Sequence, residues 1–265
     1  MELSYYTLLV LTLITVVSGN GSSNSTVIYY NGVYVNTTDA RVATSRSAHA
    51  TAQSVYRNFF TKIILNADVH EIDLTILLDS SLSIGASNHK NAKFLLKTMI
   101  GVMKRNNFPS RVRTSMYSFS MSGYITREFA FGEVKFRELI RRSIYRSQFQ
   151  NASYTHLTNA LYWMDLKMQR YCRPTAKKVL IIATDGIADD DTMDDQGLNG
   201  PVSSLRDHNV ETYVVALGED LDLTRISVIA SDSESEHIFY LKDTTYTGKV
   251  MEGLMDRMTA HYSKS

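Results

Sequence analysis

The chain alternates between short apolar runs and longer stretches in which apolar residues recur at helical spacing. Two apolar runs, at 72–78 and 178–183, are rich in Ile and Leu, and each ends within two residues of an aspartate. Runs of this length, closed by Ser- or Gly-containing segments, are typical of strands buried on both faces of a parallel sheet. We expect two more strands at 210–217 and 237–241.

Apolar residues three and four positions apart predict helices between these strands. The clearest helix spans 157–171, where five apolar side chains share one face. The other helices are expected at 90–106, 132–144, 203–207, 221–230 and 247–262. Strands that alternate with helices along a chain form a mostly parallel sheet covered by helices on both faces. The expected fold class is therefore a doubly wound α/β domain.

One pair of strands interrupts this alternation. Segments 111–120 and 123–131 are separated by a short turn, which predicts an antiparallel hairpin. We therefore expect one antiparallel edge strand on the otherwise parallel sheet.

The beginning of the chain differs in composition from the rest. Residues 1–19 hold an apolar stretch too short to span a bilayer comfortably, and a polar Asn/Ser/Gly segment follows at once. We interpret them as a secretory signal peptide rather than a buried strand or helix. Residues 20–67 are then an N-terminal extension, and 68–265 form the α/β domain.

The extension carries signs of an exposed, secreted segment. Its Asn/Ser/Thr-rich part, 20–39, favours a loose chain over a short hairpin at Asn31-Gly32, and a lead-in helix is expected near 48–64. Asn-x-Ser/Thr sequons, which accept N-linked glycans in secreted proteins, lie at Asn20, Asn24, Asn36 and Asn151.

Composition restricts the class of protein. The 265 residues are 44% hydrophobic and 21% charged, values typical of a globular protein with a full core. A net charge of +1 supplies no broad basic field for nucleic acid or an anionic membrane, and no second long apolar run predicts a membrane span. The single cysteine, Cys172, is either an inert thiol or the link in a disulfide dimer.

Oxygen-bearing side chains follow two of the predicted strands. Asp79, Ser81 and Ser83 lie at the end of the first strand, and Asp185 lies at the end of the second. Ligands of open α/β sheets bind beyond the carboxyl ends of the strands, so we expect these side chains to gather there. Carboxylates and hydroxyls form a hard-oxygen set that suits Mg²⁺ or a similar cation.

Three motifs in order resemble the von Willebrand factor type A domain family. They are Asp79-x-Ser81-x-Ser83, then Thr155 ahead of the helix at 157–171, and then Thr184-Asp185-Gly186. The resemblance extends over about 71–263. It implies a metal-ion-dependent adhesion site (MIDAS), whose metal-holding residues would be Asp79, Ser81, Ser83, Thr155 and Asp185.

The resemblance also implies how such a site works. Ser81 and Ser83 would bind Mg²⁺ (or Mn²⁺ or Ca²⁺) directly, the two aspartates directly or through water, and Thr155 in a ligand-dependent way. Neutral hydroxyls leave the ion electrophilic, so an Asp or Glu carboxylate of a partner protein can bind it.

The function implied is that of a secreted vWA domain that binds an extracellular protein, such as a matrix or collagen-like partner. This resembles matrilins, collagen-associated A domains and the inserted domains of integrins. The alternative is a structural, self-assembling matrix component in which the metal serves stability. No enzyme is expected, because the chain has neither a Gly-x-Ser-x-Gly nucleophile elbow nor a Gly-x-x-x-x-Gly-Lys phosphate loop.

Two local features carry further expectations. The family's loop before the threonine usually contains glycine, whereas this chain has 151–154, Asn-Ala-Ser-Tyr, where a glycan on Asn151 would restrict the choice of partner. The acidic run at 189–195 is either a second site, for a cation or a basic ligand, or a solvated loop. Runs of like charge are usually exposed to solvent, which favours the solvated loop.

Overall fold

The computed structural model describes residues 14–16, 27–30, 33–36, 70–121, 125–190, 197–231 and 237–241. The chain divides into two compact units, Met1–Ala50 and Thr51–Ser265, which we describe separately. The helices expected at 48–64 and 247–262 lie outside the described residues.

The first unit contains a small antiparallel sheet of three strands, β1 (Ile14–Val16), β2 (Val27–Tyr30) and β3 (Val33–Asn36), in that order. Tyr30 pairs with Val33, so β2 and β3 flank the Asn31-Gly32 pair. Our preference for a loose chain is wrong for these residues, and the hairpin alternative holds. Cleavage of 1–19 as a signal peptide stays a prediction.

The second unit is built on a six-stranded sheet of order β6-β5-β4-β7-β8-β9. Every neighbouring pair is parallel except β5 and β6, so the predicted antiparallel edge strand is confirmed. The strand bounds are β4 (Ile72–Asp79), β5 (Val112–Phe119), β6 (Thr126–Phe129), β7 (Lys177–Thr184), β8 (Val210–Leu217) and β9 (Ile238–Leu241).

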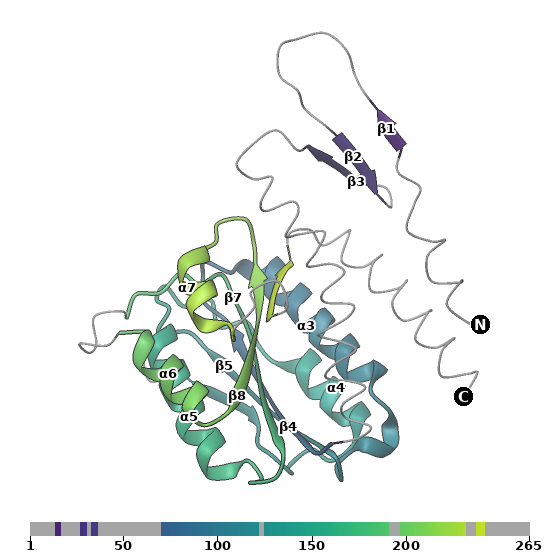
Figure 1. Cartoon of the computed structure of the whole chain (residues 1–265), viewed down its shortest axis with the longest axis vertical. Helices are drawn as coiled ribbons and strands as arrows, with labels where there is room; N and C mark the ends of the chain where they lie inside the picture. Colours follow the sequence, from purple (N-terminus) through teal and green to yellow (C-terminus); the bar gives the residue numbers. More distant parts are fainter. Residues whose placement is uncertain are drawn as a thin grey trace. The chain divides into compact units, whose positions relative to one another are not determined.

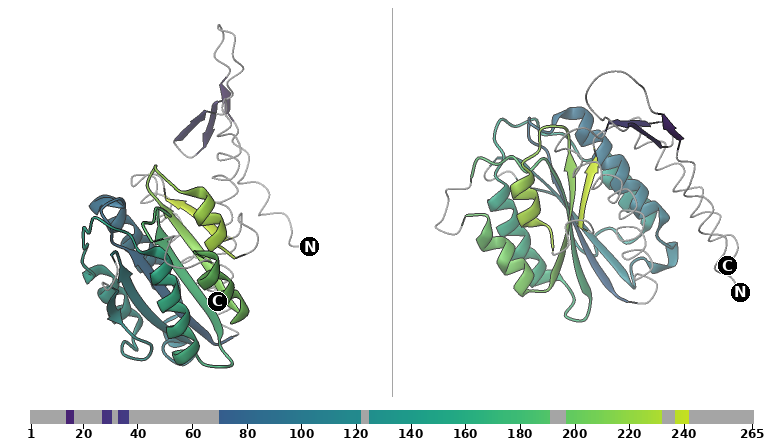
Figure 2. Two further views of the ribbon diagram at one scale, coloured as in Figure 1. Left: turned by 90° about the vertical axis from the view of Figure 1, so that its left-hand side faces the viewer. Right: turned by 45° about the horizontal axis from the view of Figure 1, so that its top comes forward.

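Five helices occur among the described residues, and they form two layers. Helices α3 and α4 cover one face of the sheet, and α5, α6 and α7 cover the other (Figures 1 and 2). Their bounds are α3 (Gly85–Val102), α4 (Arg137–Arg146), α5 (Leu157–Tyr171), α6 (Asn199–Asp207) and α7 (Leu223–Ile229). The predicted doubly wound α/β fold is confirmed.

Strand β4 shows why the sheet is covered on both faces. All eight of its residues are buried, and successive side chains alternate between the layers. Leu74, Ile76 and Leu78 pack under α3 and α4, whereas Leu77 packs under α5. Burial of each such side chain contributes about 1.5–3 kcal/mol, so neither helical layer is dispensable.

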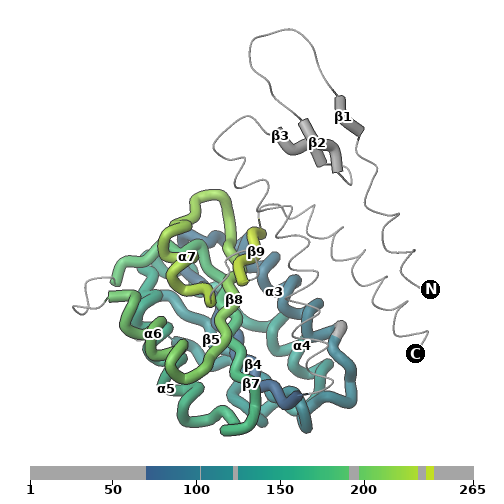
Figure 3. Tube along the Cα trace, in the orientation of Figure 1, coloured from purple at the N-terminus to yellow at the C-terminus, as the bar shows by residue number. Residues whose placement is uncertain are grey.

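The order of the strands determines where a ligand can bind. From β4 the chain runs outward through β5 and β6, and then returns to β7 on the other side of β4. The tube in Figure 3 labels β4, β5 and β7 along this course. Beyond β7 it continues through β8 and β9 in the opposite direction. The carboxyl ends of β4 and β7 therefore border the crevice in which doubly wound folds bind ligands.

Candidate metal centre

The predicted aspartates meet at this crevice. Asp79 is the last residue of β4, and Asp185 directly follows β7, the strand paired beside it. Both side chains are buried, at 0% and 1% exposure. Two acids from strands that are far apart in sequence thus face one location.

Hydrogen bonds fix the Asp79 carboxylate. Its Oδ1 accepts from the amide of Ser81 at 3.0 Å and from the Ser81 hydroxyl at 2.7 Å. Its Oδ2 accepts from the Thr184 hydroxyl at 2.7 Å. Thr184 in turn accepts from the amide of Gly186 at 3.1 Å, so one network joins the ends of both strands.

The second carboxylate is less completely bonded. Asp185 Oδ1 accepts from the amide of Ile187 at 2.9 Å. Its Oδ2 is buried and has no hydrogen-bond partner among the described residues. The Ser83 hydroxyl lies 3.1 Å from that of Ser81, and it also lowers the pKa of Asp185 through hydrogen bonding. Asp79, Ser81, Ser83 and Asp185 therefore form one cluster of oxygens.

The electrostatics of this cluster are unfavourable when both acids are ionised. Burial, reinforced by repulsion from Asp185, raises the pKa of Asp79 to about 7, although the hydrogen bonds from Ser81 and Thr184 oppose the rise. Burial also raises the pKa of Asp185. The fold thus holds two carboxylates close together, and no cationic side chain among the described residues forms an ion pair with either of them.

Thr155 is attached to the loop that follows β7. Its side chain is buried, its amide donates to Asp189 Oδ2 at 2.7 Å, and its carbonyl accepts from the Asp189 amide at 2.8 Å. Asp189 lies four residues after Asp185, so this pairing holds Thr155 beside the carboxyl end of β7. Both of these hydrogen bonds involve the backbone of Thr155 rather than its hydroxyl, and one of them uses the Asp189 carboxylate.

The loop before Thr155 is attached to the loop after β4. Ser81 and Ala152 form an isolated parallel bridge, and the amide of Leu82 donates to the Ala152 carbonyl at 2.8 Å. Asn151 adopts a left-handed backbone conformation with φ of 53°, which asparagine tolerates better than most residues. Its side chain is exposed, so a glycan there would lie beside the cluster.

The acidic run does not behave uniformly as a solvated loop. Asp190 is 2% exposed, and its carboxylate accepts from the amides of Thr158 and Asn159 at 3.1 and 2.8 Å. It therefore caps the N-terminus of α5, where backbone amides lack partners within the helix. Our preference for a solvated loop is wrong for Asp190, and residues 191–196 lie outside the described part of the chain.

Sequence reasoning assigned no role to three supporting residues besides Asp189 and Asp190, although two of them, Thr184 and Gly186, belong to the third motif. Thr184 bonds Asp79, and buried Ser80 accepts from the amide of Gln150 at 2.7 Å, which anchors the loop leading to Thr155. Gly186 has φ of 79°, and a Cβ there would lie 2.8 Å from the carbonyl oxygen of Asp222. A hydroxyl directly before the aspartate and a glycine directly after it were the available signals.

The residues fit a divalent cation. The unpartnered Oδ2 of Asp185 is an orphaned buried acceptor, and two hydroxyls and a second carboxylate lie around it. Hard oxygen donors of this kind suit Mg²⁺, and a bound ion would offset the repulsion between the acids. The described residues contain no cluster of three His, Cys, Asp or Glu side chains fit for a metal, so the hydroxyls would be essential ligands.

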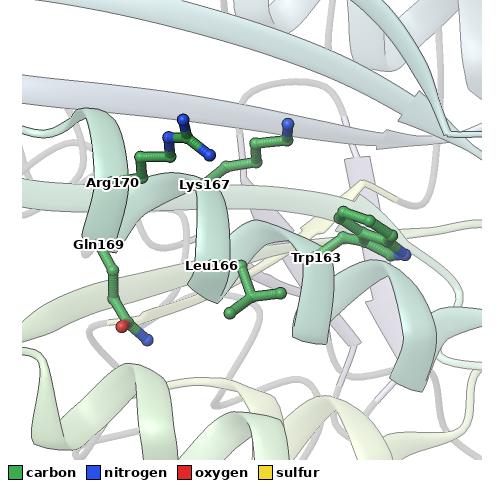
Figure 4. Close-up of a pocket in the computed structure, with 5 residues that line it drawn as sticks. All are labelled: Trp163, Leu166, Lys167, Gln169 and Arg170. Carbon is green, nitrogen blue, oxygen red and sulfur yellow. The ribbon is translucent and has the colours of Figure 1, made fainter.

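Four other features could contribute to a functional site: a pocket on α5, His156, Cys172 and the apolar character of the helices. A shallow pocket on the outer face of α5 is lined by Trp163, Leu166, Lys167, Gln169 and Arg170 and includes none of the predicted metal-holding residues (Figure 4). His156 occupies the N-cap position of α5, and its side chain makes no capping hydrogen bond there. Cys172 is a free, half-buried thiol. None of the described helices is long and apolar enough to cross a membrane.

Comparisons with known proteins agree with this architecture. The model of the von Willebrand factor type A domain family matches residues 73–253. Among curated relatives, mouse collagen alpha-5(VI) chain is 28% identical over 59% of this chain, and mouse matrilin-2 is 23% identical over 70% of it. The chain spans only 6% of the collagen chain and 19% of matrilin-2.

Solved structures share the fold. Proximal thread matrix protein 1 from the mussel byssus, described with a zinc-occupied MIDAS motif, has a TM-score of 0.57 at 20% identity and covers 70% of this chain and 45% of its own. Manganese-loaded TRAP protein from Plasmodium vivax has a TM-score of 0.52 at 18% identity, and the match covers 70% of this chain and 73% of the TRAP chain. The solved relatives thus include proteins described with a divalent cation bound.

Proposed function

This chain belongs to the von Willebrand factor type A domain family, and we propose that it is a secreted protein that binds an extracellular protein ligand through a divalent cation. The cation would be held by Asp79, Ser81, Ser83, Thr155 and Asp185. When bound, it would supply a Lewis-acidic position for a carboxylate of the partner. The relatives named as collagens and matrilins support an adhesive or matrix role.

One observation carries this proposal. Two buried aspartates from adjacent strand ends lie close together beside two hydroxyls, and one carboxylate oxygen has no hydrogen-bond partner within the described part of the chain. A structural carboxylate pair would be expected to have a cationic side chain or a full set of hydrogen bonds. The arrangement is instead destabilising without a cation, which is typical of a site maintained for binding.

The residues of the chain have separate tasks in this proposal. Asp79 orients Ser81 through two hydrogen bonds, and Thr184 orients Asp79. Asp189 holds the backbone of Thr155 through its carboxylate and its amide. Because Ser81 and Ser83 are neutral, they would leave the charge of the ion largely uncancelled. Mg²⁺ is the expected ion, with Mn²⁺ or Ca²⁺ as substitutes.

The test is capture of ligands from an extracellular-matrix extract by the immobilised chain, with EDTA or with EDTA followed by excess Mg²⁺. We expect capture to be lost with EDTA and restored by Mg²⁺, while circular dichroism shows a folded domain throughout. The alternative, a self-assembling component with a stabilising metal, predicts concentration-dependent polymers without any foreign ligand and unfolding in EDTA. Capture that is indifferent to EDTA would contradict the proposal.

A further inference from the structure

The net charge of +1 conceals a strong separation of charge along the chain. Residues 70–178 contain 18 Lys and Arg against seven Asp and Glu, whereas 179–241 contain two against 14. The boundary falls within β7, near the centre of the sheet. The β4-β5-β6 half of the sheet, with its helices, is therefore basic, and the β8-β9 half is acidic.

The basic charge is concentrated on the α3 and α4 layer. Helix α3 carries Lys90, Lys93 and Lys97 and no acidic residue. Helix α4 carries four arginines, and Glu138 is the one carboxylate on either helix. The two helices pack side by side on the same face of the sheet (Figures 1 and 2). We call this surface the α3–α4 basic face, and its cations are Lys90, Lys93, Lys97, Arg137, Arg141, Arg142 and Arg146.

Most of this charge is not neutralised locally. Glu138 bonds both Arg137 and Arg141, at 2.8 and 2.7 Å, so one carboxylate is shared by two guanidinium groups. Lys90, Arg142 and Arg146 are exposed and form no ion pair with another described residue. Like charges that lie close together on a helical surface repel one another, and for Arg142 no ion pair with a described residue offsets this repulsion.

Two of the lysines are held in place at the surface. Lys93 Nζ donates to the carbonyls of Tyr145 and Ser147 at 3.1 and 2.7 Å, which ties α3 to the end of α4. Lys97 Nζ lies 5.4 and 5.5 Å from the ring centroids of Phe94 and Tyr145. Both rings are exposed, so cations are positioned on the outer surface before any partner arrives.

The shape of the charge distribution indicates a linear anion. Lys90 and Lys97 are seven residues apart on one helix, a span of about 10 Å, and the arginines run beside them on α4. Charges spread over two adjacent helices do not converge on one small anion. Guanidinium groups match planar or tetrahedral oxyanions with two parallel hydrogen bonds, and lysines add point charges.

We propose that the α3–α4 basic face binds a linear sulfated polysaccharide, independently of the metal site. A protein partner is less favoured, because lysines are depleted from protein interfaces and the exposed rings of Phe94 and Tyr145 already carry Lys97. Release of counterions from a polyanion supplies a driving force that needs no shape complementarity. The cations of this face include Lys90, Arg142 and Arg146, which form no ion pair with another described residue, and none of the predicted metal-holding residues belongs to the face.

The test is titration of the full chain with a heparin oligosaccharide at several NaCl concentrations, once in Mg²⁺ and once in EDTA. We expect binding that weakens with salt. The double variant Arg142→Glu, Arg146→Glu should bind heparin at least about tenfold more weakly at moderate salt. The slope of log affinity against log NaCl concentration should become less negative by roughly one to two. Lys167→Glu with Arg170→Glu on α5 makes the same change in net charge on the opposite face, and it should lower affinity less than threefold.

Several outcomes would overturn the proposal. Equal losses in the two double variants would show that net charge, not the α3–α4 basic face, governs binding. Equal or tighter binding of polyglutamate, single-stranded DNA or phosphatidylserine vesicles would point to an acidic protein, nucleic acid or membrane instead. Loss of heparin binding specifically on chelation would place the ligand at the metal site. Circular dichroism confirms that each variant is folded, and milder Arg142→Gln with Arg146→Gln should give a smaller loss of the same kind.

Discussion

Replacement of Asp79 by asparagine should stabilise the metal-free domain and abolish its response to metal. Asp79 is fully buried, and its pKa is raised from about 3.8 to about 7 by burial and by Asp185. A group with a raised pKa stabilises the fold fully below its unfolded value and loses that contribution as pH rises through the folded value. At pH 8 the ionised Asp79 therefore destabilises the metal-free protein, by an amount on the order of 2–4 kcal/mol.

The asparagine variant keeps most of the local bonding. Its side-chain oxygen can still accept from the amide and hydroxyl of Ser81, whereas the hydrogen bond from Thr184 to Oδ2 is lost or reversed. That loss costs about 1 kcal/mol. We therefore expect a net gain of about 1–3 kcal/mol at pH 8 in EDTA, or roughly 3–8 °C in Tm for a domain of this size. Near pH 4 the gain should vanish, because Asp79 is then protonated in the native state.

Metal should reverse the order of stability. Saturating Mg²⁺ stabilises a protein that binds it by about 2.7 kcal/mol at 100 times Kd, and the asparagine variant should gain nothing. The assay is thermal unfolding followed by circular dichroism, at pH 4 to 8, with EDTA or Mg²⁺. The parent chain should melt below the variant in EDTA and approach or exceed it in Mg²⁺.

Asp73→Asn supplies a matched control in the same strand. Asp73 is also fully buried, but its carboxylate bonds Arg113 and Arg173, each at 2.8 Å. Removal of its charge leaves two cations undercompensated and should destabilise the fold by about 3–5 kcal/mol with or without metal. If Asp79→Asn behaved like this control in EDTA at pH 8, the reasoning about a strained carboxylate pair would be refuted.

Three further predictions follow from single contacts. Gly186→Ala should destabilise the fold by roughly 3 kcal/mol or more, since the new Cβ meets the Asp222 carbonyl oxygen. Gly132→Ala has open space around the new Cβ and should cost about 1 kcal/mol. Denaturant unfolding measures both losses, and equal losses would contradict the clash. Burial raises the pKa of Cys172 to about 12, so the native thiol should react with iodoacetamide at pH 8 roughly 10²–10³ times more slowly than the thiol of the urea-unfolded chain. Non-reducing gels should show a monomer, and a disulfide dimer would contradict this prediction. Asp190→Ala should lower stability by about 1–2 kcal/mol and weaken Mg²⁺ binding, as calorimetry would show, because α5 loses its cap next to Thr155; an unchanged Tm would contradict the capping role.

The strongly periodic elements could be predicted from the sequence. Helix α5 and strand β8 have the bounds expected, 157–171 and 210–217. In both, the apolar pattern runs the full length of the element, so local preference and tertiary burial agree. The convergence of Asp79 and Asp185 could also be predicted, because parallel strands align their carboxyl ends at one edge.

The first residues of helices α3 and α4 were harder to predict than the existence of the helices, because polar residues at helix ends contribute little to the apolar periodicity. Helix α3 begins at Gly85 rather than at 90, since its first turn is polar and exposed. Helix α4 begins at Arg137 rather than at 132, since the preceding residues form a turn in which Glu133 accepts from the amide of Ala130 at 2.7 Å. Such boundaries depend on individual hydrogen bonds.

The supporting residues of the site could not be predicted for a related reason. Asp190 lies in a charge run whose composition is that of a solvated loop, and its capping role depends on where α5 passes in three dimensions. Thr184 has a role only because β7 lies beside β4. The pattern of the α3–α4 basic face was likewise hidden, since net charge averages over regions that the fold separates.

The central claim is tested most directly by calorimetric titration of Mg²⁺ into the metal-free chain and into a Ser81→Ala, Ser83→Ala double variant. The account predicts one site per parent chain and at least about a hundredfold weaker binding by the variant, with both proteins folded by circular dichroism. Equal affinity in the two proteins, or no binding by the parent chain, would contradict a cation held between the ends of β4 and β7.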